Sequence, residues 1–271
     1  MAKPKEIELP DDTVIPILYE DRSVIAVDKP RGWMLAPDSW DKNGRNLQLA
    51  IESSLSSGAF WARSRNLKYL RFIHRLDADT SGVLLLARSA GALSTLSELF
   101  ESRRVEKKYL AVVRGVPRQS EWVSRGRIAP VEGAVGLMCV DERDGKDAET
   151  TFRVLRTGQG TALVEACPAT GRTHQIRLHL ADSGHPVLGD ILYGLEKARV
   201  TEGFARLALR ATSLAYPDPF QRRTIRVEAP VDAFLSEYGF APIKRPEIPM
   251  RGPAIQKPPT RPRLGTDVGH R

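Results

Sequence analysis

The sequence predicts an α+β domain in which a few helices flank a central, mixed and mainly antiparallel sheet. Short apolar runs rich in β-branched residues follow one another along the chain, whereas apolar residues at helical spacing occur in only three segments. A parallel sheet would require a helical crossover between each pair of strands, so most neighbouring strands are expected to be antiparallel. The 271 residues, 41% of them apolar, suffice for one large domain or two small ones.

The first strand is expected close to the N-terminus. Residues 1–13 form a polar lead, and residues 14–30 are predicted to be extended because residues 23–28 are rich in β-branched side chains. The motif Lys29-Pro30-Arg31-Gly32 stops this segment in a turn. One strand followed by a turn is therefore expected.

Two amphipathic helices are predicted next, because apolar residues recur at spacings of three and four. These residues are Leu47, Ile51 and Leu55 in the first helix and Leu93, Leu96 and Phe100 in the second. Ser89 directly precedes the second helix, and its hydroxyl is suited to cap the free backbone N–H groups there.

Most of the remaining apolar runs are predicted to be strands. They cover residues 83–87, 109–113, 151–155, 162–166, 207–216 and 224–227. A third helix is expected after Gly171, with Thr173 as its cap and with Ile176 and Leu180 on its apolar side. Gly184, followed by Pro186, would end that helix.

Composition and charge limit the classes of function. A net charge of +8 favours a polyanionic partner such as RNA, DNA or an acidic membrane surface. Because no run of about 18 apolar residues and no hydrophobic N-terminal segment occur, we expect neither a membrane span nor a secretory signal, and hence a cytoplasmic protein. Aromatic residues make up only 7% of the chain, so stacking on many bases is not expected as the main mode of binding.

Neither a metal nor an organic cofactor is expected. Cys139 and Cys167 lack the CxxC spacing of a zinc or redox site, and the histidines at 174, 179 and 185 do not form HExxH. No GxxxxGK[ST] or GxGxxG motif indicates ATP or a dinucleotide. The cysteines are interpreted as structural thiols and the histidines as structural or RNA-facing residues.

The last segment, residues 242–271, differs from the domain of residues 14–241. It carries seven prolines among basic residues and only Glu247 and Asp267 as acidic ones. Such a composition does not bury enough apolar surface to fold, so a flexible cationic arm is expected. The arm could attract phosphate without reading sequence, or it could be a solvated tail with no partner.

The segment most suggestive of chemistry is residues 72–87. A charged loop containing Asp77 runs into Ser81-Gly82 and then into an apolar strand, which would fix the loop at the edge of a rigid sheet. Catalytic groups are often found at such edges. An aspartate beside an arginine is, however, also common as a surface ion pair or a turn residue, and this segment alone leaves both interpretations open.

Four collinear stretches, spanning most of residues 15–240, resemble the RluA-type pseudouridine synthases. They are Ile17-Leu-Tyr-Glu-Asp21 through Asp28-Lys29-Pro30-Arg-Gly32; His74-Arg75-Leu76-Asp77 with Thr80-Ser81-Gly82; Lys107-Lys108-Tyr109-Leu110-Ala111; and Gly171-Arg172-Thr173-His174-Gln175-Ile176-Arg177 through Gly184 to Asp190 and Tyr193-Gly194. The resemblance implies a catalytic domain with a central mixed sheet and an RNA-binding cleft. It also implies an isomerase that converts uridine into pseudouridine in structured RNA, without any cofactor.

The resemblance assigns three catalytic positions. Asp77 matches the essential aspartate of the family, Tyr109 its active-site tyrosine, and Arg177 the basic partner that orients the aspartate. Whether Asp77 attacks carbon as a nucleophile or removes a sugar proton as a base stays open, because an ionised carboxylate in one place serves both roles.

Arg75 is expected to help extrude the target uridine from its stack, a step that costs roughly a few kcal/mol. The other residues expected to contact RNA are Lys29, His74, Lys107, Lys108, Arg172 and His174. Ribosomal RNA and transfer RNA are both plausible substrates, and a monomer is the default expectation.

Two features depart from the family pattern. Arg210 stands where the family usually has histidine, and the lead before residue 14 is too short for the S4-type RNA-binding domain of several members. Two other functions were weighed. One is an RNA-binding protein of the same fold without activity, which would have no need of the three catalytic positions; the other is a hydrolase that cleaves the nucleoside bond, which would lower the mass of the RNA.

Overall fold

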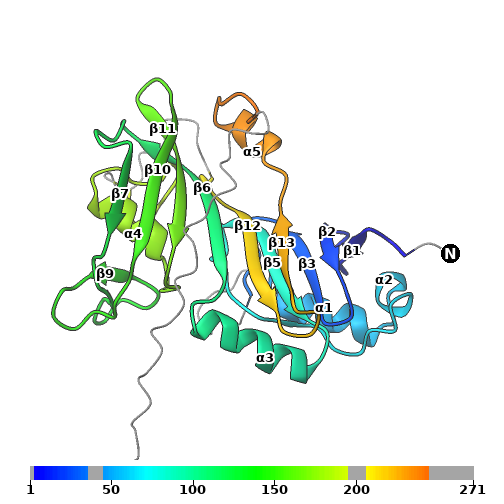
Figure 1. Cartoon of the computed structure of the whole chain (residues 1–271). Coiled ribbons are helices and arrows are strands. Elements are labelled where there is room, and N and C mark those ends of the chain that lie inside the picture. Colours follow the sequence, from blue (N-terminus) through cyan, green and yellow to red (C-terminus); the bar gives the residue numbers. More distant parts are fainter. Residues whose placement is uncertain (1–2, 36–44, 195–205, 244–271) are drawn as a thin grey trace, which may run out of the picture.

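The computed structural model describes residues 3–35, 45–194 and 206–243. Almost all of the predicted cationic arm, residues 242–271, lies outside these ranges. Within them, strands and helices follow the predicted α+β class (Figure 1).

One large sheet organises the described chain. Its hydrogen-bonded order is β1-β2-β3-β5-β12-β6-β11-β10-β7, with β13 paired to β12 and β4 paired to β5. The strands are β1 (Glu6–Glu8), β2 (Val14–Glu20), β3 (Val24–Lys29), β4 (Arg71–Phe72), β5 (Ser81–Ala87), β6 (Glu106–Arg114), β7 (Glu121–Ser124), β10 (Thr150–Thr157), β11 (Thr161–Pro168), β12 (Leu209–Asp218) and β13 (Arg223–Glu228). A separate hairpin consists of β8 (Ile128–Pro130) and β9 (Met138–Val140).

The sheet is mixed and mainly antiparallel, as predicted. Among the pairings between strands of the described residues, only that of β5 with β12 is parallel. Gly82 makes this pairing possible: its φ is +113°, and a Cβ atom on it would lie 2.0 Å from the carbonyl oxygen of Ala211. The strand that follows the Asp77 loop therefore depends on a glycine at its second residue.

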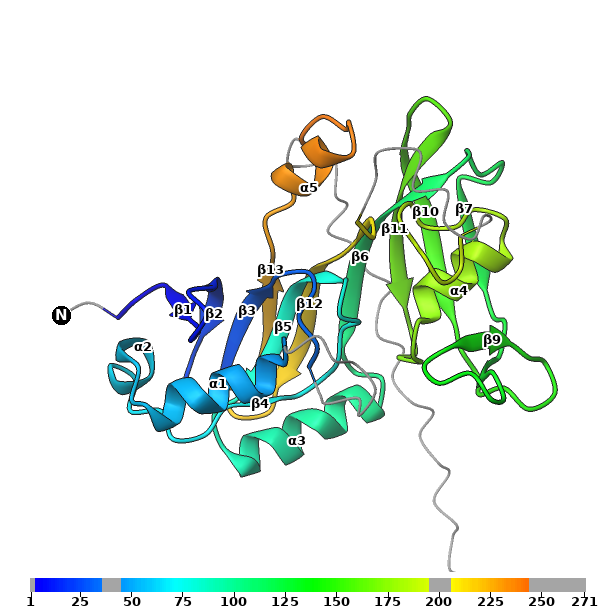
Figure 2. The same cartoon turned by 180° about the vertical axis from the view of Figure 1, so that it is seen from behind.

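Helices cover both faces of the half of the sheet that contains β3 and β5. Successive residues of β5 point to opposite faces, so Leu84 and Leu86 pack with α1 (Leu47–Ser56), while Val83 and Leu85 pack with α3 (Ala90–Glu101). Figure 2 shows α1 in front of these strands, and Figure 1 shows it behind them. All seven residues of β5 are buried, which makes this strand a rigid base for the loop before it.

The other half of the molecule is built on β6, β11 and β10. Against it pack α4 (Gln175–Asp182), through Ile176 and Leu180, and α5 (Asp232–Glu237), through Phe234 and Leu235. Strands β6 and β12 lie side by side where the two halves meet (Figure 1). A site that draws on the β4–β5 loop, β6 and α4 therefore lies at this junction.

The predicted helices at residues 47–55 and 93–100 are confirmed. The Ser89 hydroxyl accepts a hydrogen bond from the backbone N–H of Ala92 and caps α3. The third helix is also present, but the prediction that Thr173 caps it is wrong. The N-cap is His174, which lies in the left-handed region at φ 56° and makes no side-chain capping hydrogen bond.

The N-terminal region contains more strand than expected. The single strand predicted over residues 14–30 is a hairpin of β2 and β3, whose turn is fixed by Asp21: its Oδ1 accepts from the backbone N–H groups of Ser23 and Val24. The polar lead contributes β1, in which Ile7 is fully buried. The sequence also gave no prediction for α2 (Phe60–Arg63), α5 and the short strands β4, β7, β8 and β9.

Candidate active site

The loop between β4 and β5 carries Asp77. The buried side chain of Lys29 holds the backbone of this loop in place. The Lys29 ammonium, at the end of β3, donates to the carbonyl oxygens of Ala78 at 2.7 Å, Thr80 at 3.0 Å and Asp77 at 3.3 Å, as well as to that of Pro30 at 3.0 Å. The side chain is fully buried, and burial lowers the pKa of Lys29 to about 7. The expectation that Lys29 contacts RNA is therefore corrected, because its donors are taken up inside the protein.

Arg177 holds the side chain of Asp77. Its Nη1 donates to Asp77 Oδ2 at 3.2 Å, across 100 residues of sequence. Its other two nitrogens bind Asp190: Nε donates to Oδ2 at 2.7 Å and Nη2 to Oδ1 at 2.8 Å. Burial disfavours the charged guanidinium, but Asp190 and Asp77 outweigh this effect and raise the pKa of Arg177. Asp77 therefore always has a cation beside it.

The chain after α4 completes this arrangement. Asp190 Oδ1 also accepts hydrogen bonds from the backbone N–H groups of Leu192 and Tyr193, so the carboxylate is fixed from both sides. The guanidinium of Arg177 lies 5.1 Å from the centre of the Tyr193 ring. Both Asp190 and Tyr193 lie in the matching stretch that ends at Gly194, but neither had a predicted role, because only folding brings their partners close.

Tyr109, on β6, lines the same cavity as Asp77. Burial, reinforced by the nearby charge of Asp77, raises the pKa of the Tyr109 hydroxyl, so it stays protonated at neutral pH. Lys107 is two residues earlier and lines the cavity as well, whereas Lys108 does not, because side chains alternate along a strand. Lys108 lies 3.8 Å from Glu165 instead, so the structure does not bring it into the cavity with the other predicted site residues.

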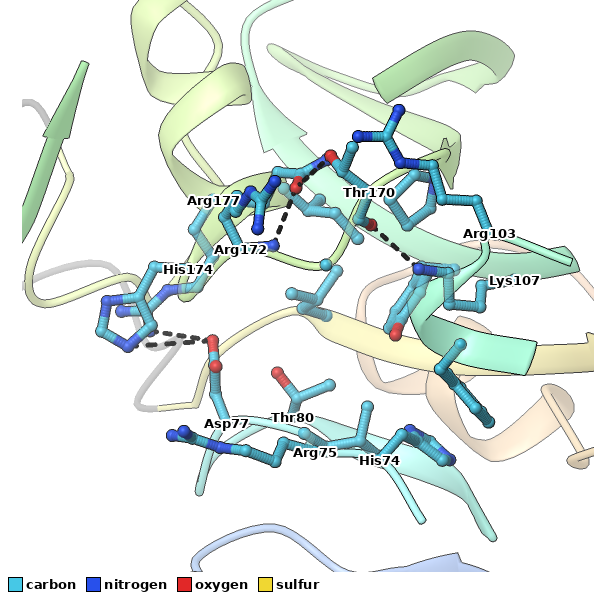
Figure 3. A pocket seen from close by; sticks show the side chains of 18 of the residues that line it. His74, Arg75, Asp77, Thr80, Arg103, Lys107, Thr170, Arg172, His174 and Arg177 are labelled. Carbon is cyan, nitrogen blue, oxygen red and sulfur yellow. Dashed lines mark hydrogen bonds and ion pairs between the residues drawn. The ribbon is translucent and has the colours of Figure 1, made fainter. Parts of the chain in front are cut away.

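The cavity has a volume of about 490 Å³, within the range of pockets that hold a small molecule or a nucleotide. Eight of the ten predicted site residues line it. They are His74, Arg75, Asp77, Lys107, Tyr109, Arg172, His174 and Arg177. Figure 3 shows Asp77 facing His174 and Arg177, with His74 and Arg75 on the same side of the cavity as Asp77.

The remaining lining residues differ in how far they are available to a ligand. His74 is a wall residue: its ring stacks on Phe100 at 4.8 Å, and its Nε2 accepts from the backbone N–H of Leu85. Burial lowers the pKa of His74 to about 3, so it is neutral. Lys107 donates to the Thr170 carbonyl at 2.9 Å, and burial lowers its pKa to about 8. Arg75 is exposed.

Arg103 also lines the cavity, near Lys107 and on the side away from Asp77 (Figure 3). It follows the last turn of α3 with φ 57°, a conformation that favours glycine.

Arg210, the departure from the family pattern, lies outside this cavity. Its Nη2 pairs with Asp28 Oδ2 at 2.7 Å and its Nη1 donates to the Ser81 hydroxyl at 3.1 Å. Arg210 therefore ties β12 to β3 and to the start of β5, and it contacts neither Asp77 nor Arg177. Arg210 thus joins these strands behind the loop.

The described residues contain neither a metal-binding cluster nor a membrane-spanning helix. No three His, Cys, Asp or Glu side chains in those ranges gather closely enough to hold a metal ion. None of the helices there has the length and apolar character needed to cross a membrane.

A comparison with known families matches residues 23–182 to the model of the RNA pseudouridylate synthases. This range contains the Asp77 loop, Tyr109 and Arg177. The chain belongs to this family. The membership inferred from the four sequence stretches is thereby confirmed.

Curated pseudouridine synthases share about a third of the sequence. The chain is 34% identical over 225 residues to "Ribosomal large subunit pseudouridine synthase C" of Yersinia pestis, covering 80% of this chain and 65% of that protein. The protein of the same name from Escherichia coli strain K12 is 34% identical over 227 residues, covering 80% and 66%. The chain thus spans just under two thirds of the length of these relatives.

Solved pseudouridine synthase domains share the fold. "Human RNA Pseudouridylate Synthase Domain Containing 1" is 30% identical, with a TM-score of 0.63 over 80% of this chain and 83% of that one. "Human RNA Pseudouridylate Synthase Domain Containing 4" is 27% identical, with a TM-score of 0.64 over 79% and 87%. The fold expected of a pseudouridine synthase is therefore confirmed.

Proposed function

We propose that this protein isomerises uridine to pseudouridine in structured RNA and that Asp77 is its catalytic carboxylate. The observation that carries the proposal is the geometry of that carboxylate. Its Oδ2 is bound by Arg177, whereas its Oδ1 makes no hydrogen bond with any residue that the structure describes. The side chain is 26% exposed, so this second oxygen is available to a nucleotide in the cavity.

The reaction requires little more than such a carboxylate. The N1–C1′ bond of uridine breaks, the uracil turns, a C5–C1′ bond forms, the proton on C5 leaves and N1 takes up a proton, so the composition of the RNA is unchanged. Asp77 serves either by attacking the sugar carbon or by removing a sugar proton. Arg177 supports both roles because it keeps a positive charge beside the carboxylate.

Tyr109 supports the reaction by position. Because the pKa of its hydroxyl is raised, Tyr109 does not supply a tyrosinate base near neutral pH. Its ring can stack on uracil, and its neutral hydroxyl can donate a hydrogen bond to the base or to a water that accepts the C5 proton.

Cations around the cavity fit RNA as the substrate. Arg75 is exposed beside Asp77 and is placed to enter the stack that the uridine leaves. Arg103 lines the cavity on the side away from Asp77, where the backbone of the RNA would pass (Figure 3), and Arg172 lines it as well. The curated relatives are named for large-subunit ribosomal RNA, which makes it the first substrate to test, with transfer RNA second.

The proposal includes a monomer acting in the cytoplasm. Light scattering during size-exclusion chromatography measures the mass in solution directly.

Mapping pseudouridine in total RNA from cells with and without the gene, followed by in vitro reaction with the RNA identified, tests the function. The wild-type protein is expected to leave the RNA mass unchanged while creating pseudouridine, whereas a hydrolase would lower the mass by the lost base. Asp77→Asn is expected to abolish the product while sparing RNA affinity. RNA binding without any product by the wild-type protein would instead identify an inactive RNA-binding member of the fold.

A further inference from the structure

One imidazole lies between the catalytic carboxylate and a tyrosine. His174 Nδ1 is 2.7 Å from the hydroxyl of Tyr193, and His174 Nε2 is 4.0 Å from Asp77 Oδ2. One ring nitrogen of His174 thus faces Tyr193, and the other faces Asp77. The histidine side chain is only 13% exposed, so water has little access to it.

The hydrogen bonds fix which nitrogen carries the proton. Tyr193 accepts a hydrogen bond from the backbone N–H of Met138 at 3.0 Å, and its single hydroxyl proton is then available to His174 Nδ1. Burial lowers the pKa of His174, an effect that Asp77 partly opposes, so the ring is neutral near pH 7. We assign the proton of the neutral ring to Nε2, where it faces Asp77, because the opposite tautomer would turn a lone pair toward the carboxylate.

The backbone of His174 gives a second, independent observation. It adopts φ 56° at the N-cap of α4, where Ser, Thr, Asp or Asn would normally accept a hydrogen bond from the helix. His174 makes no such bond. A disfavoured backbone conformation and the loss of a cap both accompany the placement of the ring beside Asp77 (Figure 3).

We propose that His174 is a positioning residue for Asp77, with Tyr193 orienting the imidazole. In the complex with RNA, the Nε2–H group closes on Asp77 Oδ2 beside Arg177 and holds the carboxylate so that Oδ1 faces the sugar. The separation of 4.0 Å fits a protein without substrate, because catalytic hydrogen bonds commonly tighten only in the complex. This inference rests on the proposed function and replaces the sequence-based expectation that His174 contacts RNA.

The same contacts connect the site to the β8–β9 hairpin. Met138 is the first residue of β9, and its N–H group binds the hydroxyl on which the histidine depends. If the hairpin moved away from Tyr193, the Tyr193 hydroxyl would lose this hydrogen bond and could rotate away from His174. The hairpin therefore contributes to the orientation of Asp77 without reaching the cavity.

Single-turnover rates and RNA dissociation constants of four variants test the inference, using the full chain and an RNA that the wild-type protein modifies. Tyr193→Phe removes the neutral hydrogen bond to His174, together with the one from the Met138 N–H group, and should slow the reaction by about threefold to tenfold. His174→Asn suits the left-handed backbone but is too short to reach Asp77, so we expect a loss of about tenfold to a hundredfold. His174→Gln places an amide N–H near the position of Nε2 and should restore part of the rate.

The fourth variant combines Tyr193→Phe with His174→Asn, and it should be no slower than His174→Asn alone because the tyrosine acts through the histidine. Tyr19→Phe is the matched control. Tyr19 lies on β2, away from the cavity, and its hydroxyl donates to the Asp21 carboxylate at 2.9 Å. Removing this hydroxyl should keep the wild-type rate. Dissociation constants should be unchanged in all variants.

Three results would overturn the inference. They are a wild-type rate in Tyr193→Phe and His174→Asn, additive losses in the combined variant, and weaker RNA binding at an unchanged saturated rate, which would make His174 an RNA contact. Unfolding midpoints separate a failed fold from a slow reaction, and Tyr193→Phe decides the matter if His174→Asn does not fold. If the wild-type protein forms no pseudouridine at all, the proposed function fails instead.

Discussion

Arg177 and Asp190 form a two-point ion pair that is almost completely removed from water, with side chains 7% and 1% exposed. The pair fixes the guanidinium plane, so the remaining nitrogen of Arg177 has one direction in which to donate, and Asp77 lies there. A residue that does not touch the substrate thereby sets the orientation of the proposed catalytic group.

Asp190→Asn should accordingly impair both stability and catalysis. Breaking one partner of a buried pair leaves the other charge uncompensated, and we expect a loss of about 3 kcal/mol in the free energy of unfolding. The misplaced guanidinium should slow pseudouridine formation by about tenfold to a hundredfold. Urea unfolding and single-turnover assays measure the two effects. Glu237→Gln, which breaks the more exposed pair with Arg31, should cost no more than about 1 kcal/mol.

Lys107 should make RNA binding depend on pH. Burial lowers its pKa to about 8, so the ammonium is charged below that pH and neutral above it. A cation that attracts phosphate is lost as pH rises, and affinity should fall through this range. Fluorescence anisotropy with the Asp77→Asn variant, from about pH 6.5 to about pH 9, would measure it without turnover.

Lys107→Arg should flatten this pH dependence, because a guanidinium stays charged throughout. Lys108→Arg provides the control, since Lys108 is next along the strand but outside the cavity. An equal flattening by both variants would contradict the assignment of the effect to Lys107.

Arg103→Gly should stabilise the protein while weakening RNA binding. The left-handed conformation at φ 57° costs a side-chain-bearing residue about 1–2 kcal/mol, and the greater entropy of glycine in the unfolded chain offsets part of the gain, leaving about 0.5–1 kcal/mol. Loss of one phosphate contact should make the slope of log affinity against log salt concentration shallower by about one. Thermal unfolding and salt titrations measure the two effects.

Arg222→Gly is the matched control for that prediction. Arg222 has φ 54° in the turn between β12 and β13 and does not line the cavity. A similar gain in stability with unchanged RNA affinity is expected. Weaker RNA binding by Arg222→Gly as well would mean that total charge, rather than the position of Arg103, determines affinity.

Gly82→Ala should disrupt the parallel pairing of β5 with β12. The added Cβ would lie 2.0 Å from the Ala211 carbonyl oxygen, and φ +113° is unfavourable for alanine. We expect a loss of more than about 3 kcal/mol, measured by urea unfolding. Gly91→Ala in α3 meets no atom within 4 Å and should instead add about 0.5–1 kcal/mol through helix propensity. Equal unfolding free energies would refute the argument.

Local pattern was sufficient to predict much of the fold. Periodicity and β-branching depend only on neighbouring residues. They were therefore sufficient to predict the helices α1 and α3 and the strands β5, β6, β10, β11, β12 and β13. The short strands β4 and β7 to β9 were missed because two to four residues carry no period, and pairing partners far away in sequence define them.

The sequence by itself determined the family and the residues available for chemistry, since the four matching stretches name Asp77, Tyr109 and Arg177 directly. Only the tertiary structure decided what each side chain does. It buried Lys29 under the loop, turned Lys107 into the cavity and Lys108 away from it, and joined Arg177 to Asp190. The physical reason is that burial, strand facing and ion pairing depend on which distant segments pack together, and the linear order of residues does not record that.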